Sequence, residues 1–186
     1  NARGGWHDAA DLLKYLLTSG NATAQMLLAY QMGGLKSKAQ SPTPANQESG
    51  IQTDRVNSLG QPYPNGIPDL LDEARWGLDW MLRMHPRPDQ LFHQVAADRD
   101  HQYFELPFSD STDYGWGKGA YRVVYYADGR PQGLGRYQNT STGIANLAGR
   151  YAAAMAMAAA VWAHDLGDQG YATLCLTAAR EVYAMG

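Results

Sequence analysis

Two aspartates three positions apart, Asp8 and Asp11, are the first candidate catalytic residues of the chain. They lie in GGWHDAAD (residues 4–11), after two glycines and Trp6. Residues three apart share a face in a turn or at a helix start, so both carboxylates could flank one water molecule. The same spacing suits the entry of a helix, where carboxylates cap free N–H groups. Spacing alone favours the helix cap. The glycine pair, which allows tight backbone geometry, and Trp6, which could stack on a substrate, instead favour a catalytic site.

A second stretch with candidate functional residues is DHQYFELPFSDSTDYGWGKG, residues 100–119. It gathers polar and aromatic side chains, namely His101, Tyr103, Phe104, Glu105, Asp110, Asp113, Tyr114 and Trp116. The spacing matches neither a tetrahedral zinc signature nor an EF-hand loop. Tyr and Trp rings stack on pyranose faces while their O–H or N–H groups find partners, so the stretch favours a loop that lines a sugar cleft. Plain loop packing is the alternative.

Composition and motifs narrow the function classes. The net charge of −3 without a Lys/Arg cluster argues against a nucleic-acid partner. We find no run of about eighteen apolar residues, so no membrane partner is expected. The lone Cys175 excludes an internal disulfide, and its alanine-rich surroundings predict a buried, inert thiol. Signatures of a serine hydrolase, a phosphate-binding loop and a zinc protease are absent from the sequence.

Four segments carry the periodicity of helices and must position these residues. They are residues 21–32, 68–84, 142–164 and 169–184. Two long irregular stretches, 33–66 and 87–139, separate them, and long ordered loops in a helical domain are often functional. Within the second stretch, YRVVYYADGRPQG predicts a β-hairpin that turns at Asp128-Gly129. Four helices are too few to close a ring of helix pairs, so the pattern fits either a small helical domain or part of an α/α barrel.

Three motifs resemble one family. GGWHDAADLLKY is similar to the Gly-Gly-Trp-Tyr/His-Asp-Ala-Gly-Asp segment of glycoside hydrolase family 9, the cellulase family with an (α/α)6 barrel. NGIPDLLDEARWGLDWMLRM (residues 65–84) and TSTGIANLAGRYAAAMAMAAAVW (residues 140–162) resemble the next helix of that family and its alanine-rich inner helix, in the same order. The resemblance implies an all-α fold: a partial (α/α)6 barrel with long loops and a small β-hairpin. Residues 1–186 would form a single partial domain, the N-terminal portion of the catalytic barrel.

The resemblance also implies an inverting glycoside hydrolase. Asp11 matches the general base that activates the attacking water, and Asp8 matches the partner that helps to hold this water. A base and an acid on opposite faces of the sugar ring then complete the reaction. We expect Trp6, His7, Tyr114 and Trp116 to contact the substrate, a β-linked glucan or a related polysaccharide or oligosaccharide.

Two departures from the family pattern bear on activity. Ala10 stands where the family usually has Gly, which argues against strict reuse of the turn geometry. The family's catalytic acid is a Glu near the end of a much longer domain, and Glu48, Glu73, Glu105 and Glu181 all sit in other contexts. We therefore expect this chain to lack the acid and to be inactive alone. The alternatives are a non-catalytic carbohydrate-binding relic, or another hydrolase on an α/α toroid in which Asp8 and Asp11 merely cap.

The remaining expectations concern cofactors, location and association. No cofactor is expected from the residues; the resemblance implies calcium, whose ligands are not assignable here. It also implies a secreted or periplasmic protein. Exposed inner-barrel helix faces would leave an apolar patch that promotes self-association or binding to the rest of a barrel.

Overall fold

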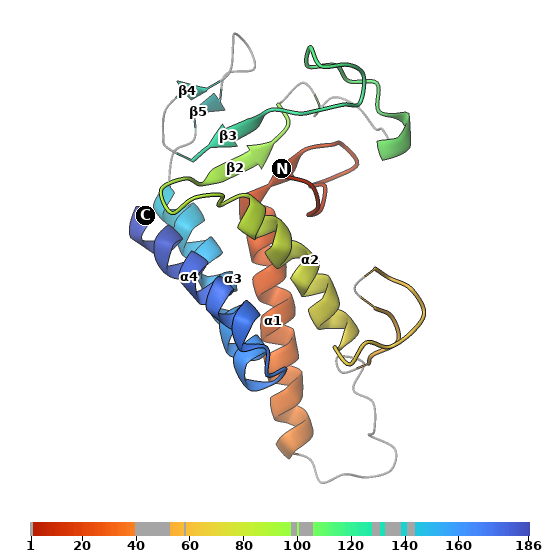
Figure 1. Cartoon of the computed structure of the whole chain (residues 1–186), viewed down its shortest axis with the longest axis vertical. Coiled ribbons are helices and arrows are strands. Elements are labelled where there is room, and N and C mark those ends of the chain that lie inside the picture. Colours follow the sequence, from red (N-terminus) through yellow and green to blue (C-terminus); the bar gives the residue numbers. More distant parts are fainter. Residues whose placement is uncertain are drawn as a thin grey trace.

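The computed structural model describes residues 2–39, 53–57, 59–97, 100, 106–127, 131–132, 139–140 and 144–186. These residues form four α-helices: α1 (Leu16–Ala39), α2 (Asp69–Arg83), α3 (Ile144–His164) and α4 (Gln169–Met185). A three-stranded sheet of β1 (Lys14–Tyr15), β2 (Phe92–Val95) and β3 (Val124–Tyr126) lies across one end of the helices, and α1 runs between α2 and the α3–α4 pair (Figure 1). The helical architecture expected from the sequence is confirmed.

Helix α2 is the element whose limits the sequence predicts best. Pro68 precedes its first residue, and Asp69 and Asp72 occupy the first turn, where carboxylates favour the positive end of the helix dipole. One face buries four side chains against the core: Leu71, Ala74, Leu78 and Met81. Because capping signals and a single apolar stripe agree, local sequence specifies this helix.

Helix α1 is longer than its predicted range of residues 21–32. It starts at Leu16, directly after β1, and runs through Gly33 and Gly34 to Ala39. Glycines weaken a helix by about 1 kcal/mol each relative to alanine, so local propensity predicts that this helix ends before Gly33. Packing of α1 against α2 and α3, with Leu16 and Leu27 buried, overrides that propensity.

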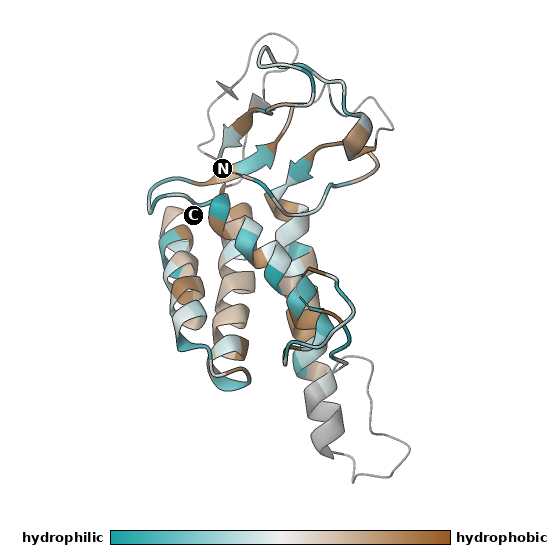
Figure 2. Cartoon of the chain, turned by 45° about the vertical axis from the view of Figure 1, so that its right-hand side comes forward, coloured by the Kyte–Doolittle hydropathy of each residue, from teal (hydrophilic) through white to brown (hydrophobic). Residues whose placement is uncertain are grey.

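Helix α3 packs between α1 and α4 and is apolar along its length (Figure 2). By length and composition it is apolar enough to cross a membrane, although Asn146 and Arg150 interrupt its apolar run. The core helix of a folded domain passes the same test, and α3 buries ten side chains against its neighbours. Asp168 caps the following helix α4 by accepting the N–H of Tyr171 at 2.9 Å.

The β-structure differs from the predicted hairpin. Strand β3 pairs with β2, with Val95 opposite Val124, while β4 (Pro131–Gln132) pairs with β5 (Asn139–Thr140). The two arms of the predicted hairpin therefore join different sheets, and the Asp128-Gly129 turn lies outside the described residues. Alternation of apolar and polar residues predicts a strand but does not specify the strand with which it pairs. Here packing over the helix ends selects β2 as the partner of β3.

The prediction for Cys175 is confirmed. The side chain is fully buried in α4, and burial raises the pKa of its thiol to about 12. A thiol with so high a pKa is a poor nucleophile at neutral pH.

Candidate active site

The N-terminal segment, residues 2–7, is held along α2 by side chains of that helix. Three donors on α2 bind three carbonyl groups of the segment. These bonds are Trp80 Nε1 to Ala2 O (3.2 Å), Arg83 Nη1 to Arg3 O (2.9 Å) and Trp76 Nε1 to Gly5 O (3.2 Å). The donors are spaced three to four residues apart and so share one face of the helix. The path of the segment is thus dictated by a regular element rather than by its own backbone bonding.

Packing against α2 explains why residues 4–6 are Gly-Gly-Trp. Gly4 and Gly5 have φ of +94° and +69°, and a Cβ on Gly5 would lie 2.5 Å from the Trp80 ring. Trp6 lies over Gly77 of α2 and donates its N–H to Glu73 Oε1 at 2.6 Å. The indole of Trp6 is therefore bound to the protein, and its predicted contact with substrate stays a prediction.

Asp8 and Asp11 lie on a closed loop rather than at the start of a helix. The N–H of Asp8 donates to Leu13 O at 2.9 Å, and the N–H of Leu13 donates to Asp11 Oδ1 at 3.1 Å. An aspartate that accepts the N–H two residues on forms an Asx turn. Helix α1 begins only at Leu16, so the helix-capping alternative for this pair is wrong. Asp11 is 7% exposed, whereas Asp8 is on the surface.

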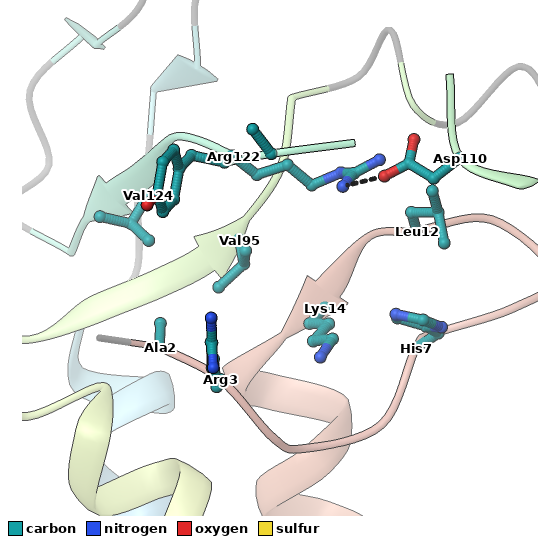
Figure 3. Close-up of a pocket in the computed structure, with 11 residues that line it drawn as sticks. Ala2, Arg3, His7, Leu12, Lys14, Val95, Asp110, Arg122 and Val124 are labelled. Atoms are coloured by element: carbon teal, nitrogen blue, oxygen red, sulfur yellow. Dashed lines mark hydrogen bonds and ion pairs between the residues drawn. The ribbon is translucent and has the colours of Figure 1, made fainter. Parts of the chain in front are cut away.

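A cavity of about 650 Å³ lies beside this loop, between the N-terminal segment and the sheet (Figure 3). His7 and Lys14 line one side, and Arg122 with Asp110 lines the other. Burial and the cationic groups of Lys14 and Arg122 lower the pKa of His7, and the Asp11 carboxylate acts in the opposite direction. Burial, followed by the charge of Arg122, lowers the pKa of Lys14, whose Nζ donates to Gly4 O at 2.7 Å.

Arg122 anchors the wall of the cavity that residues 106–123 form. Its Nε lies 3.1 Å from Asp100 Oδ2, and its Nη1 lies 2.6 Å from Asp110 Oδ2. The hydrogen bond from Arg122 holds the pKa of Asp110 below its usual value. Tyr114 donates its hydroxyl proton to Asp100 at 2.6 Å and accepts the N–H of Ala97 at 2.7 Å. The Tyr114 hydroxyl thus connects the end of β2 to the following loop.

The backbone just after β2, next to the cavity, is strained at Ala96. Ala96 has a φ of +75°, a left-handed conformation that costs a non-glycine residue roughly 1–2 kcal/mol. Two bonds hold it there: its N–H donates to Val123 O at 2.9 Å, and Gln94 Nε2 donates to its carbonyl at 2.8 Å. Strain of this kind persists only where the surroundings fix it, here beside Val95 on the cavity wall.

The structure brings together only part of the predicted site. Trp6, His7, Asp8 and Asp11 share one loop, while the 106–123 segment reaches the cavity through Asp110 and Arg122 rather than through Tyr114 or Trp116. Trp116 is 56% exposed. The expected contributions of His101, Tyr103, Phe104 and Glu105 lie outside the described residues.

Sequence reasoning missed Lys14 and Arg122. Lys14 follows Asp11 at the same spacing that separates Asp8 from Asp11, which was a usable signal. Arg122 gave a weaker one, as a lone cation among aromatic and β-branched residues. In the part of the chain that the structure describes, no group of three or more His, Cys, Asp or Glu side chains could hold a metal ion. The ligands of the calcium that the resemblance implies stay unassigned.

Comparison with known proteins gives a consistent picture. The family model described as glycosyl hydrolase family 9 matches residues 1–186. The chain is 27% identical over 173 residues to the cellulose 1,4-beta-cellobiosidase of Acetivibrio thermocellus, covering 93% of this chain and 16% of that enzyme. It also resembles the crystal structure of a metagenome-derived glycoside hydrolase family 9 endoglucanase, with a TM-score of 0.57 and 28% identity over 96% of this chain and 25% of that one.

A further solved structure shows the fold alone. The cellulase Cel9M of C. cellulolyticum in complex with cellobiose superposes with a TM-score of 0.62 at 23% identity, over 98% of this chain and 32% of that one. The four helices are thus part of an (α/α)6 barrel. The chain spans less than a third of the length of each of these three proteins.

Proposed function

The chain belongs to glycosyl hydrolase family 9, and from this membership we propose that it is the base-carrying part of an inverting glycoside hydrolase. The substrate would be a β-linked glucan or a related polysaccharide, and the protein would be secreted or periplasmic. One observation carries the proposal: Asp8 and Asp11 lie on a short loop closed by two hydrogen bonds to Leu13. The loop follows a segment held to α2, so the backbone of both residues and the Asp11 carboxylate have a defined position before substrate binds.

In the proposed mechanism Asp11 is the general base. It takes a proton from a water molecule as that water attacks the anomeric carbon, and Asp8 helps to hold the water. A carboxylic acid on the opposite face of the sugar protonates the leaving oxygen, and in inverting enzymes the two carboxyl groups stand ~6.5–9.5 Å apart to admit the water. Partial burial suits a base because it limits competing solvent around Asp11.

The acid is proposed to lie outside this chain. Two of the four glutamates are described, and both have structural partners: Glu73 accepts the N–H of Trp6, and Glu181 lies 2.9 Å from His85 Nε2. Glu48 and Glu105 lie outside the described residues. We therefore expect no hydrolysis of β-glucan by the 186-residue chain alone. Release of reducing sugar by this chain would contradict the assignment.

The direct test replaces Asp11 by Asn in the whole protein that carries this chain. Removing a general base lowers turnover by about 10²–10⁴-fold, so kcat on a soluble β-1,4-glucan should fall by that amount while substrate binding is retained. Asp89→Asn, in the exposed turn before β2, is the matched control and should keep full turnover. Unchanged kcat in Asp11→Asn would remove the base role.

The same measurement addresses the second candidate function. A non-catalytic carbohydrate-binding relic would bind glucan without turnover in the wild-type protein. His7, which lines the cavity, and the exposed Trp116 would serve as substrate contacts in either case.

A further inference from the structure

The cavity beside the Asp8–Asp11 loop has properties that glucan hydrolysis does not require. Neither Asp8 nor Asp11 lines it; the residues that flank the loop, His7 and Leu12, do so. Val95 and Val124 of the sheet form an apolar wall, and Tyr121, 69% exposed, lies at its edge. At about 650 Å³ the cavity is within the usual size range of small-molecule sites.

The cavity carries more cationic than anionic groups. Arg3, Lys14 and Arg122 line it, and Asp110, which is already paired with Arg122, is the one carboxylate among its lining residues. The ammonium of Lys14 is partly buried, and the neutral Gly4 carbonyl is the hydrogen-bond partner that the described residues provide for it. Buried ammonium groups are ordinarily paired with an anion, so Lys14 is under-compensated.

Two further polar residues, Arg122 and His7, line the cavity together with Lys14. Arg122 Nη2 is buried and has no hydrogen-bond partner among the described residues. His7 stands opposite, and burial, followed by the charges of Lys14 and Arg122, lowers its pKa. A bound carboxylate would compensate the Lys14 ammonium through a charge-assisted hydrogen bond.

We propose that this cavity binds the carboxylate of an acidic sugar, so that the protein recognises a uronic acid unit of a substituted or acidic polysaccharide. The anionic group is inferred from the donors, and the pyranose from the apolar wall, Tyr121 and the adjoining loop. The sugar part rests on the proposed function, whereas the anion part stands on the cavity itself. The carboxylate would lie against the Lys14 ammonium, and the valine wall accepts one face of the ring.

The test is calorimetric titration of the protein with three probes. A disaccharide of glucuronic acid and glucose should bind about tenfold more tightly than cellobiose, which has the same size without the charge. Acetate, the carboxylate alone, should bind more weakly than the acidic disaccharide. The binding of the acidic disaccharide should weaken as sodium chloride is raised.

Substitutions locate the binding. Lys14→Gln keeps a donor for the Gly4 carbonyl but removes the charge, and it should weaken the acidic disaccharide about tenfold while leaving cellobiose unchanged. Lys14→Arg should restore the preference. The matched control, Lys118→Gln, removes an exposed cation outside the cavity and should bind like the wild type. His7→Gln, which leaves the Gly4 bond intact, serves as a second variant if circular dichroism shows that Lys14→Gln is unfolded, and it should also weaken the acidic disaccharide.

Three results would overturn the proposal: equal affinity for the acidic disaccharide and cellobiose, an undiminished preference in the folded Lys14→Gln protein, or acetate binding as tightly as the disaccharide. Failure of the glucan-hydrolysis proposal would give a different experimental result. It would appear as unchanged turnover in Asp11→Asn, and it would leave the binding preference intact.

Discussion

Asp8 and Asp11 occupy different environments although they belong to one short loop. Asp11 is buried and bonded to the N–H of Leu13, whereas Asp8 lies at the surface and is tied down through its own N–H. The proposed division of labour, with one carboxylate removing the proton and the other holding water, matches this difference. Ala10 between them is not among the described residues with positive φ, so the loop accepts a Cβ where the family usually has Gly.

Asp110 gives the clearest pH prediction at the scale of one residue. The hydrogen bond from Arg122 lowers its pKa in the folded state, so the pairing stabilises the fold above the unfolded-state pKa of about 3.9. This stability is lost as the pH falls through the lower folded-state pKa. We expect Asp110→Asn to cost about 1–3 kcal/mol at pH 6 and to flatten the loss of stability below pH ~4.

Urea unfolding of wild type and Asp110→Asn between pH 3 and pH 6 measures this difference. Asp89→Asn, at an exposed position, controls for the loss of one negative charge and should follow the wild-type curve. If the free energy of unfolding fell equally steeply below pH ~4 in Asp110→Asn and in the wild type, the Asp110–Arg122 pair would contribute nothing to acid sensitivity.

Among the elements, α2 has two faces with separate tasks. One face packs into the core through Leu71, Leu78 and Met81, and the other binds the N-terminal segment through Trp76 and Arg83. The segment that leads into the Asp8–Asp11 loop is therefore positioned by a helix that sequence distance places far away. Damage to this contact should reach the loop without touching either aspartate.

Gly77 tests that contact at the scale of the element. A Cβ at this position would lie 2.3 Å from the Trp6 ring and 2.4 Å from Thr23 Oγ1, so Gly77→Ala should lower the free energy of unfolding by about 1–3 kcal/mol. Gly149→Ala, in α3, is the matched control. Nothing lies within 4 Å of its added Cβ, and alanine should stabilise the helix by about 0.5–1 kcal/mol.

Chemical denaturation of both variants gives the two free energies, and the fluorescence of Trp6 and its neighbours reports the contact itself. Equal effects of the two substitutions would indicate that the Trp6 ring moves aside without cost.

In the whole molecule, α1 and α3 present a common exposed face. Leu28 and Met32 are 48% and 51% exposed on α1, and the exposed residues of α3 include Ala145, Gly149, Ala153 and Ala156. Asn21 Oδ1 accepts a hydrogen bond from Arg150 Nη1 at 3.2 Å and joins the two helices on this side. Exposed apolar side chains on two neighbouring helices favour association.

We expect the 186-residue chain to self-associate through this face. Light scattering should show a mass that rises with protein concentration, and the double substitution Leu28→Gln with Met32→Gln should shift the molecule toward the monomer. Leu59→Gln changes a leucine that is 75% exposed in a loop and should leave association unaltered. A strict monomer at all concentrations would remove the prediction.

Much of the helical scaffold, and the identity of the Asp8–Asp11 loop, can be predicted from short stretches of the chain. Pro68, the first-turn aspartates and a regular apolar stripe specify α2 locally, and an alanine-rich stripe specifies α3 in the same way. These signals span a few turns, so they need no distant partner. The buried Cys175 and the grouping of Trp6, His7, Asp8 and Asp11 were also readable from adjacent residues.

Tertiary structure decided what depended on distant segments. Helix α1 starts at Leu16 and passes over two glycines because α2 and α3 pack against it, and β3 selects β2 rather than its neighbour in sequence. Trp6 meets Gly77, and Lys14 faces Arg122 across the cavity, over long separations in the chain. Short-range patterns fix conformation, but a cavity and its charges exist only once separate segments have been brought together, and no local spacing encodes that distance.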